Sequence, residues 1–397
     1  MNCLLAGGTV SVMSPVAKRV IGLMLAVVLI IGIVVAVLVG RLFGADTPGL
    51  IPTTQLTVVT GVIGSEKKPF FEDPEVQAIF AESGFDVQIT TAGSRQIATT
   101  VDLTDVDFVF PSSAPAAEKI KRETGASTVY APFFSPMAIA TFKPIVTLLE
   151  AAGIASQDAA GTWQLDMAAY LAAAQAGTRW SDLPGAAELY PSSRNVLISS
   201  TDIRQSNSAA MYLSMASYVA NGNEIVSSPG AEAAVIDQMA ALFLEQGFSA
   251  SSSEAPFEDY LSQGIGSKPI VMVYEAQFLG RQMSETGKNA ITDDMLLMYP
   301  QPTVFSKHTV VPLSDAGKRI GELMISDPRL ASLSAKYGFR PADASVFSET
   351  LKANGLAVPP SLVNVIEPPS YETLESMITE IATRYDTPPP ATTDVNG

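Results

Sequence analysis

Cysteine and histidine are almost absent from this sequence, which has one cysteine, Cys3, and one histidine, His308, among its 397 residues. A single cysteine cannot form a disulfide within the chain. Zinc sites, iron–sulfur clusters and Cys–His nucleophile pairs each need several such side chains, so they are excluded and no cofactor is expected. A site made of carboxylates alone stays open, although no D-x-D-x-D-G run supports a calcium site. His308 begins an apolar stretch, where a surface or capping role is expected rather than proton transfer.

Basic residues are also scarce, with 24 lysines and arginines against 40 aspartates and glutamates, a formal net charge of -16. Such a surface repels nucleic acids and anionic lipid headgroups, so neither is an expected partner. An acidic surface that keeps a folded domain soluble explains this charge better. The hydrophobic fraction of 47% predicts a large core.

Residues 20–40 contain no charged or strongly polar side chain. A helix of this length spans a hydrocarbon core of about 30 Å at about 1.5 Å per residue. Lys18 and Arg19 precede it, which favours a cytoplasmic N-terminus and an extracellular body. The expected location is therefore the cell membrane, with a single pass through residues 20–40. A cleaved signal peptide is the alternative, but its apolar region is shorter, and Phe43 stands where a cleavage site needs a small residue.

After this segment, strand-like and helix-like stretches alternate. Residues 56–60 are apolar and β-branched, Asp73 and Pro74 predict the start of a helix, and residues 85–89 alternate as a strand does. This order is typical of an α/β sheet with parallel strands. Further helices are expected over 166–176, 207–220, 231–246, 315–325 and 327–336, and further strands over 106–110, 138–141, 196–198 and 269–274.

Polar loops rich in serine and glycine follow several of the predicted strands. They are residues 64–67, 92–95, 111–113 and 201–208. In open α/β sheets, ligands gather where such loops meet helix N-termini, whose free amides bind polar or anionic groups. Taken alone, each loop is better explained as a turn or a helix cap. Together they predict one shared polar cleft.

The residues in and around these loops resemble a known family. The segments that carry the resemblance are 64–67, 134–140, 200–202, 206–208, 274–275, 299–300, 327–328 and Tyr337-Gly338-Phe339-Arg340-Pro341. Residues 56–341 resemble the bacterial extracellular solute-binding proteins with the type 2 periplasmic-binding fold, the superfamily that includes molybdate and sulfate binders. The last segment is the most specific match, and it marks the fold rather than the ligand.

The resemblance implies two α/β lobes joined by crossing strands near 134–141 and 270–274, with the ligand between them. The expected segments are a cytoplasmic N-terminus (1–19), a transmembrane helix (20–40), a spacer (41–55), lobe one (56–135 and 276–345), lobe two (136–275), a C-terminal extension (346–385) and a disordered tail (386–397).

The resemblance also implies a ligand-binding site for a small polar solute, with an ABC-type permease as a possible partner. The candidate contacts are Ser65, Glu66, Ser94, Arg95, Ser112, Ser113, Thr201, Asp202, Arg204, Ser206, Asn207, Tyr274 and Glu275. Tyr274 fits equally well as a buried hinge aromatic. Sites for bare oxyanions usually lack carboxylates, so Glu66, Asp202 or Glu275 in the cleft would favour a solute with a cationic or multi-hydroxyl part. Alanine at Arg204 or Glu275 is expected to abolish binding and to leave the unliganded stability unchanged.

Two other functions stay open. Ser65 and Lys68 match S-x-x-K, and Ser193 with Asn195 matches S-x-N, as in penicillin-binding serine enzymes, but the K-T-G strand of those enzymes is missing from the sequence. A scaffold that keeps the fold and has lost its ligand is the other alternative, because a fold does not fix a function.

Overall fold

The computed structural model describes residues 56–385, except 248, 285–286, 358–361 and 363. The predicted membrane helix over 20–40, the spacer and the tail over 386–397 lie outside the described residues. Within the described part of the chain, no helix is both long and apolar enough to cross a membrane.

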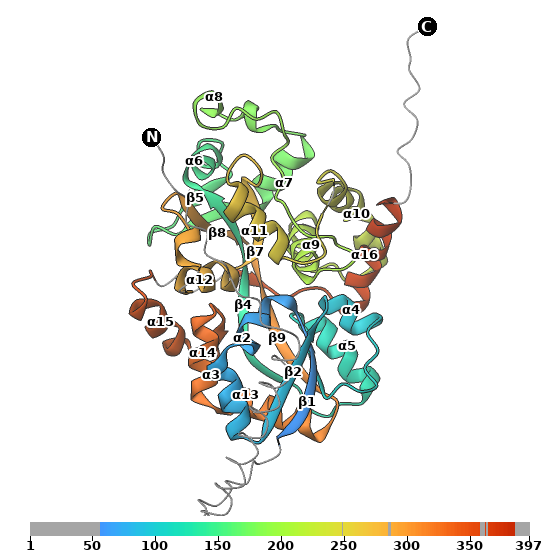
Figure 1. Ribbon diagram of the computed structural model, residues 1–397. Coiled ribbons are helices and arrows are strands. Elements are labelled where there is room, and N and C mark those ends of the chain that lie inside the picture. Colours follow the sequence, from blue (N-terminus) through green and yellow to red (C-terminus); the bar gives the residue numbers. More distant parts are fainter. Residues whose placement is uncertain (1–55, 248, 285–286, 358–361, 363, 386–397) are drawn as a thin grey trace, which may run out of the picture. The chain divides into compact units, whose positions relative to one another are not determined.

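Lobe one is built on a parallel sheet that continues into an antiparallel strand (Figure 1). Strand β1 lies between β2 and β3 and is parallel to both, and β9 pairs antiparallel with β3. The bounds are β1 Thr57–Ile63, β2 Phe85–Thr91, β3 Phe108–Phe110 and β9 Thr303–Pro312. The helices around it are α2 Lys68–Phe71, α3 Pro74–Glu82, α4 Ser94–Thr99, α5 Ala114–Thr124, α13 Asp315–Ser326 and α14 Pro328–Lys336, with a 3-10 turn η1 at Ser65–Lys67.

Both faces of this sheet are buried, as the alternation of side chains in β1 shows. Val59 and Ile63 pack with α3 and α13 in one apolar cluster, and Val62 packs with α4 and α5 in another. A parallel sheet covered on both faces is the usual result of strand–helix–strand connections. The expected helix start is confirmed, because Pro74 opens α3 and the Asp73 carboxylate accepts a hydrogen bond from the Glu75 amide.

Two strands run from one lobe into the other. Strand β4, Tyr130–Phe142, pairs with β9 through its first half and with β7 and β8 through its second half. The expected crossing near 134–141 therefore lies in β4. The second expected crossing, near 270–274, lies instead inside the sheet of lobe two, where β7 (Ile270–Tyr274) pairs with β4. Strand β9 runs beside β4 through the junction, and β8 (Met295–Gln301) also belongs to the second sheet.

Lobe two surrounds one large apolar cluster, which includes Tyr170, Tyr212 and Phe243. Its strands are β5 Ala155–Gln157, β6 Trp163–Asp166, β7 and β8. Its helices are α6 Lys143–Ala151, α7 Met167–Gln175, α8 Ala186–Leu189, α9 Asn207–Ala220, α10 Pro229–Leu244 and α11 Glu254–Gln263, with 3-10 turns η2 at Trp180–Asp182 and η3 at Lys288–Ala290. Helix α12, Glu275–Met283, follows β7 and packs against β4.

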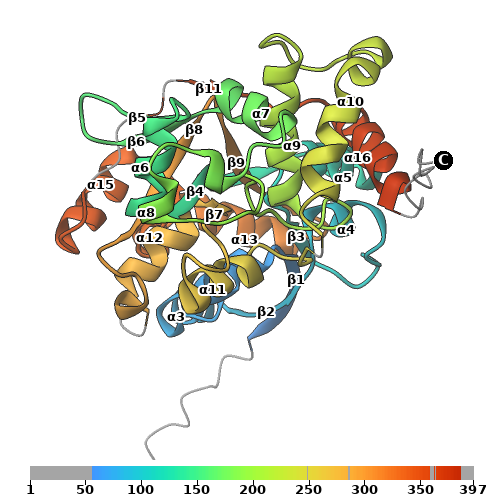
Figure 2. The ribbon, with the colours of Figure 1, turned by 90° about the horizontal axis from the view of Figure 1, so that it is seen from above.

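The expected C-terminal extension forms helices that contact both lobes. Strand β10, Arg340–Pro341, still belongs to the expected lobe one and pairs with β4. The extension then contains α15 Ala344–Ala353, which begins two residues before the expected boundary, β11 Val365–Ile366 and α16 Tyr371–Tyr385. Helix α16 lies along α10 of lobe two and touches α5 of lobe one (Figure 2). Glu375 forms an ion pair with Arg95 of lobe one, and Arg384 forms one with Asp237 of lobe two at 2.8 Å. The C-terminal helix therefore links the two lobes a second time, outside the crossing strands.

Candidate functional site

A cavity of about 220 Å³ lies where the two lobes meet. Lobe one contributes the turn after β1 (64–66), the end of β2 with the start of α4 (91–94 and Gln96) and Ser112 after β3. Lobe two contributes residues 205–207 and 251–253, and Tyr274 comes from the end of β7. The carboxyl ends of β1, β2 and β3 point to the same edge of the sheet, which is why loops far apart in sequence meet here.

Four helices begin at this cavity. Ser94, Asn207 and Ser253 lie at the starts of α4, α9 and α11, and Tyr274 precedes α12. The first amides of a helix have no partner within that helix, and they carry a partial positive charge. The cavity therefore offers hydrogen-bond donors of two kinds: backbone amides at helix N-termini, and the hydroxyl groups of the serines in its wall.

The lobes are in contact around the cavity. The Asn207 side-chain amide of lobe two donates to the Ser112 carbonyl of lobe one at 2.9 Å, and to the Tyr274 hydroxyl at 3.0 Å. Gly93 of lobe one approaches lobe two so closely that a Cβ atom there would lie 2.3 Å from the Gln205 carbonyl oxygen. The structure thus shows the lobes closed on the cavity.

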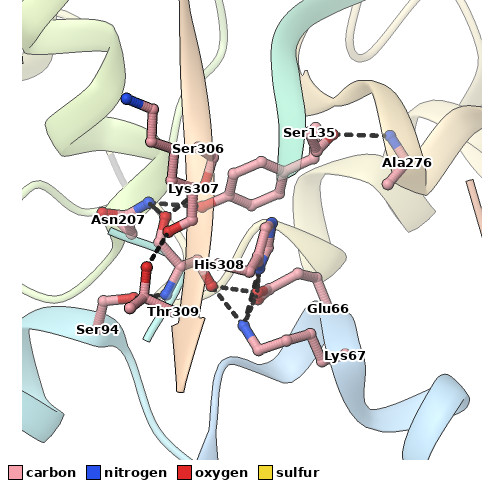
Figure 3. A network of polar contacts seen from close by, with 12 residues as sticks. Glu66, Lys67, Ser94, Ser135, Asn207, Ala276, Ser306, Lys307, His308 and Thr309 are labelled. Carbon is pink, nitrogen blue, oxygen red and sulfur yellow. Dashed lines mark hydrogen bonds and ion pairs between the residues drawn. The ribbon is translucent and has the colours of Figure 1, made fainter. Parts of the chain in front are cut away.

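A buried polar cluster forms the floor of the cavity (Figure 3). The Lys67 ammonium donates to Glu66 Oε1 at 2.5 Å, to Ser112 Oγ at 2.6 Å and to His308 Nδ1 at 3.1 Å. The Ser112 hydroxyl in turn donates to Glu66. Lys67 and His308 have no exposed surface, and the Glu66 side chain is 6% exposed. This cluster ties the turn after β1 to β9, which carries His308.

The charges in the cluster follow from burial and from these contacts. Burial alone would raise the pKa of Glu66, but the adjacent Lys67 and the hydrogen bonds outweigh it and hold that pKa well below 4.5. Burial, reinforced by the Lys67 charge, lowers the pKa of His308 to about 4. Burial also raises the pKa of Tyr274, so its hydroxyl stays neutral and can donate. Burial lowers the pKa of Lys67, although the charge and hydrogen bond of Glu66 oppose this. At neutral pH the floor therefore holds the Glu66–Lys67 contact beside a neutral imidazole. The expected surface or capping role of His308 is wrong, because tertiary packing buries its ring.

The structure brings a large part of the predicted site together. The predicted residues that line the cavity are Ser65, Glu66, Ser94, Ser112, Ser206, Asn207 and Tyr274. Their contact with a ligand stays a prediction. Of the three carboxylates considered from the sequence, Glu66 lines the cavity, and its Oε1 atom is already bonded to Lys67 and Ser112.

The other two carboxylates are held by arginines outside the cavity lining. Asp202 pairs with Arg204 at 2.6 Å. Burial would raise the pKa of Asp202, but the hydrogen bonds and charge of Arg204 outweigh burial and lower it. Glu275 is fully buried and accepts from Arg340 at 2.6 and 2.7 Å and from the Tyr299 hydroxyl at 2.5 Å. These contacts give Glu275 a structural role, so the expectation that its alanine variant keeps full stability does not fit this geometry.

Three further predicted residues also lie outside the cavity lining. Arg95 pairs with Glu375 of α16 and donates to the Arg204 carbonyl at 2.7 Å. Ser113 caps α5, and Thr201 is buried with its hydroxyl 2.8 Å from that of Ser208. Each of these side chains has its polar atoms engaged within the protein.

Sequence reasoning missed several residues of the cavity wall and floor. The missed residues are Thr91, Gln96, Gln205, Ser251, Ser252 and Ser253, with Lys67 and His308 beneath the wall. The serine run over 251–253 directly precedes α11, but it follows helix α10 and not a strand, so it lacked part of the signal that selected the other loops. Lys67 and His308 are 241 positions apart, and no local pattern could have paired them.

The motifs of the serine-enzyme alternative do not come together. Lys68 is exposed and pairs with Glu72 at 2.8 Å, away from Ser65 in the cavity wall. Ser193 and Asn195 line a different cavity, which lies within lobe two. The residues that would have to act together are therefore in separate places.

No family model and no curated protein matches the sequence. Solved structures do share its architecture. Apo ferric ion-binding protein A from Pasteurella haemolytica has a TM-score of 0.52 at 12% identity, over 83% of this chain and 96% of that chain. Iron-bound HitA from Pseudomonas aeruginosa has a TM-score of 0.51 at 9% identity, over 82% and 99%. The sulfate-binding protein SubI from Mycobacterium tuberculosis gives 0.48 at 17% identity, over 80% and 96%.

At these identities the likeness concerns the fold. The mixed α/β arrangement, the strands shared between the lobes and the cavity at their junction agree with it. The described part of the chain has the two-lobed fold of type 2 periplasmic solute-binding proteins, as the sequence predicted.

Proposed function

We propose that this protein captures a small polar solute between its two lobes and that residues 20–40 anchor it to the membrane with the binding domain outside the cell. The cavity between the lobes carries the proposal, because serine hydroxyls, the Asn207 amide and four helix starts converge on it. A permease of the ABC type would receive the solute. The apolar run of 21 residues in the sequence supports the anchor.

The cavity limits what the solute can be. Its volume of about 220 Å³ is below the roughly 300–1,000 Å³ of drug-sized sites, so the solute has few heavy atoms. Iron is the ion named for two of the similar structures. Among the described residues, no group of three or more histidine, cysteine or carboxylate side chains could hold a metal ion. Hydroxyls that both donate and accept, beside one carboxylate, suit a multi-hydroxyl or zwitterionic solute.

A thermal-shift screen of the full-length chain in nonionic detergent tests the proposal. The panel contains polyols and sugars, amino acids and small oxyanions. A true ligand at 100 times its dissociation constant stabilises the native state by about 2.7 kcal/mol, which raises the melting temperature by about 4 °C in a protein of this size. A panel without any shift counts against the proposal.

Gly93→Ala separates capture by closure from simple surface binding. Its backbone angles, φ -64° and ψ 146°, suit any residue, so alanine needs no change in the local backbone of lobe one. The added Cβ would meet the Gln205 carbonyl of the opposite lobe and prevent full closure. We expect solute affinity to fall at least about tenfold, the loss that 1.4 kcal/mol produces. Gly230→Ala is the matched control, because nothing lies within 4 Å of its added Cβ.

Closure itself can be measured with spin labels on the two lobes. Glu118→Cys in lobe one and Glu188→Cys in lobe two, both at exposed positions, are combined with Cys3→Ser. The solute is expected to shorten and narrow the distance distribution in this protein and to leave it broad in the Gly93→Ala variant. If no solute changes the distance distribution between the two labels, the result supports the scaffold alternative instead.

A further inference from the structure

A second polar cavity, of about 310 Å³, lies within lobe two, and its lining shares no residue with the cavity between the lobes. Its walls come from four short segments: 179–180, 193–200, 245–246 and 268–269. Strand β7 supports the site, because Ser199 forms a bridge with Val271 and its amide donates to the Ile270 carbonyl at 3.0 Å. The floor is therefore attached to a buried strand, and the rim is formed by turns.

The charge of this lining is opposite to that of the protein as a whole. Arg179, Arg194 and Lys268 face one carboxylate, Glu245, around the cavity, whereas the whole chain carries a formal net charge of -16. Within the described part of the chain, the side chains of Arg179 and Lys268 have no ion-pair partner. An acidic protein repels anions in general, so a local excess of cations defines a specific place for one.

Arg194 is already oriented by neutral groups. Its guanidinium donates to the Gly266 and Ser267 carbonyls at 2.8 and 2.9 Å and to the Tyr190 hydroxyl. These contacts fix the side chain beside Lys268 without cancelling its charge. A cation held in place in this way loses little further freedom when an anion binds.

One buried hydroxyl of the cavity lining has no partner. Ser200 is 5% exposed, its amide donates to Gln246 Oε1 at 2.7 Å, and its Oγ atom has no hydrogen bond among the described residues. Buried polar atoms in proteins nearly always find a partner, which can be a ligand or an ordered water. An oxyanion in the cavity would supply the missing acceptor.

We infer that this cavity in lobe two is a second binding site, for a small oxyanion with at least two negative charges. The three cationic side chains favour an anion with more than one negative charge. The buried Ser200 hydroxyl in the lining adds a neutral hydrogen-bond donor. Phosphate-bearing and polycarboxylate compounds share this chemistry. The inference does not depend on the solute between the lobes, because the two cavities are lined by different residues.

Calorimetric titration of the full-length chain in nonionic detergent at low salt tests the inference, with pyrophosphate and citrate as separate probes. We expect one equivalent of at least one probe to bind, and its affinity to fall steeply with added salt. Arg179→Gln and Lys268→Gln are each expected to weaken binding by about tenfold or more, the loss of a charge-assisted hydrogen bond. Ser200→Ala should weaken binding severalfold without lowering the melting temperature.

Lys121→Gln is the matched control, because it removes one positive charge from the surface of lobe one, outside this cavity. It is expected to leave the affinity unchanged. If neither probe binds, or if Lys121→Gln weakens binding as much as Lys268→Gln does, the inference is overturned. It is also overturned if Gly93→Ala abolishes the binding and Lys268→Gln does not, because the anion then lies between the lobes.

Discussion

The lone histidine makes the stability of this protein depend on pH between about 5 and 7. His308 has no exposed surface, and its Nδ1 atom lies 3.1 Å from the Lys67 ammonium. Because an ammonium can only donate, Nδ1 accepts, and the ring proton sits on Nε2. Protonating Nδ1 would place two cations in contact in a site from which water is excluded.

The groups around the ring set the direction and the size of the effect. The aromatic rings of Phe133 and Phe339 lie 5.4 and 5.1 Å away, and Glu66 Oε1 lies 3.4 Å from Nδ1. Glu66 favours the charged imidazole, but burial and Lys67 outweigh it and lower the pKa of His308 from 6.5 to about 4. Between these two values the unfolded chain binds a proton that the folded chain does not.

The contribution of His308 to the free energy of unfolding is therefore fully present above pH 6.5, and it is lost as the pH falls toward 4. With about 1.36 kcal/mol for each pKa unit, the free energy of unfolding is expected to fall by about 2 kcal/mol between pH 7 and pH 5. Ordinary aspartates and glutamates titrate mainly below this window, and the chain has no other histidine.

Urea unfolding of the full-length chain in detergent, followed by tryptophan fluorescence and far-UV circular dichroism, measures this change. Coincident transitions by the two probes are needed for a two-state free energy. His308→Asn is the control, because its Oδ1 atom can take the place of Nδ1 as the acceptor for Lys67. The variant should lose the slope between pH 7 and pH 5. A flat profile in the unmodified protein, or the same slope in the variant, would refute the reasoning.

Three substitutions test other contacts. Glu275→Ala leaves Arg340 buried without its carboxylate and is expected to lower the free energy of unfolding by about 3–5 kcal/mol, measured by urea unfolding. Ile381→Ala removes a fully buried side chain from α16 and should cost about 2–5 kcal/mol in the same assay. Lys67→Met leaves the buried Glu66 carboxylate unpaired and should also cost about 3–5 kcal/mol, and adding Glu66→Gln should restore part of that loss.

Exposed ion pairs supply the comparison for these substitutions. Glu72→Ala breaks the pair with Lys68, and Arg122→Ala breaks the pair with Glu372 of α16. Each is expected to change stability by less than about 1 kcal/mol, because water and salt screen exposed charges. If Glu275→Ala or Lys67→Met costs no more than these controls, the buried pairs are not structural as described.

Local patterns predicted most of the elements, since each depends on neighbours in sequence. The helix expected over 207–220 is α9 with the same bounds, and the strand expected over 269–274 is β7, one residue shorter. The strand expected over 196–198 does not form, and isolated bridges at Asn195 and Ser199 stand in its place. An apolar run alone cannot say whether a partner strand lies alongside it.

The site was predicted where it depends on loops that follow strands, and missed where it depends on pairing across the fold. The serine at the start of α4 could be selected because it follows β2, and sheet topology carries such loops to one edge. The sequence could not show that Asp202 forms an ion pair with Arg204 and that Glu275 forms one with Arg340. Those carboxylates were candidates for a ligand because their partners are set by tertiary contacts.

Composition and periodicity alone determined an acidic α/β protein with polar loops after its strands, because charge, helix period and strand alternation are local properties. Tertiary structure decided which polar residues face a cavity and which neutralise one another. It buried Lys67 and His308 together, placed α16 across both lobes and gathered three cations in lobe two. Interaction energies between charges depend on distance and on exclusion of water, and only the folded chain sets both.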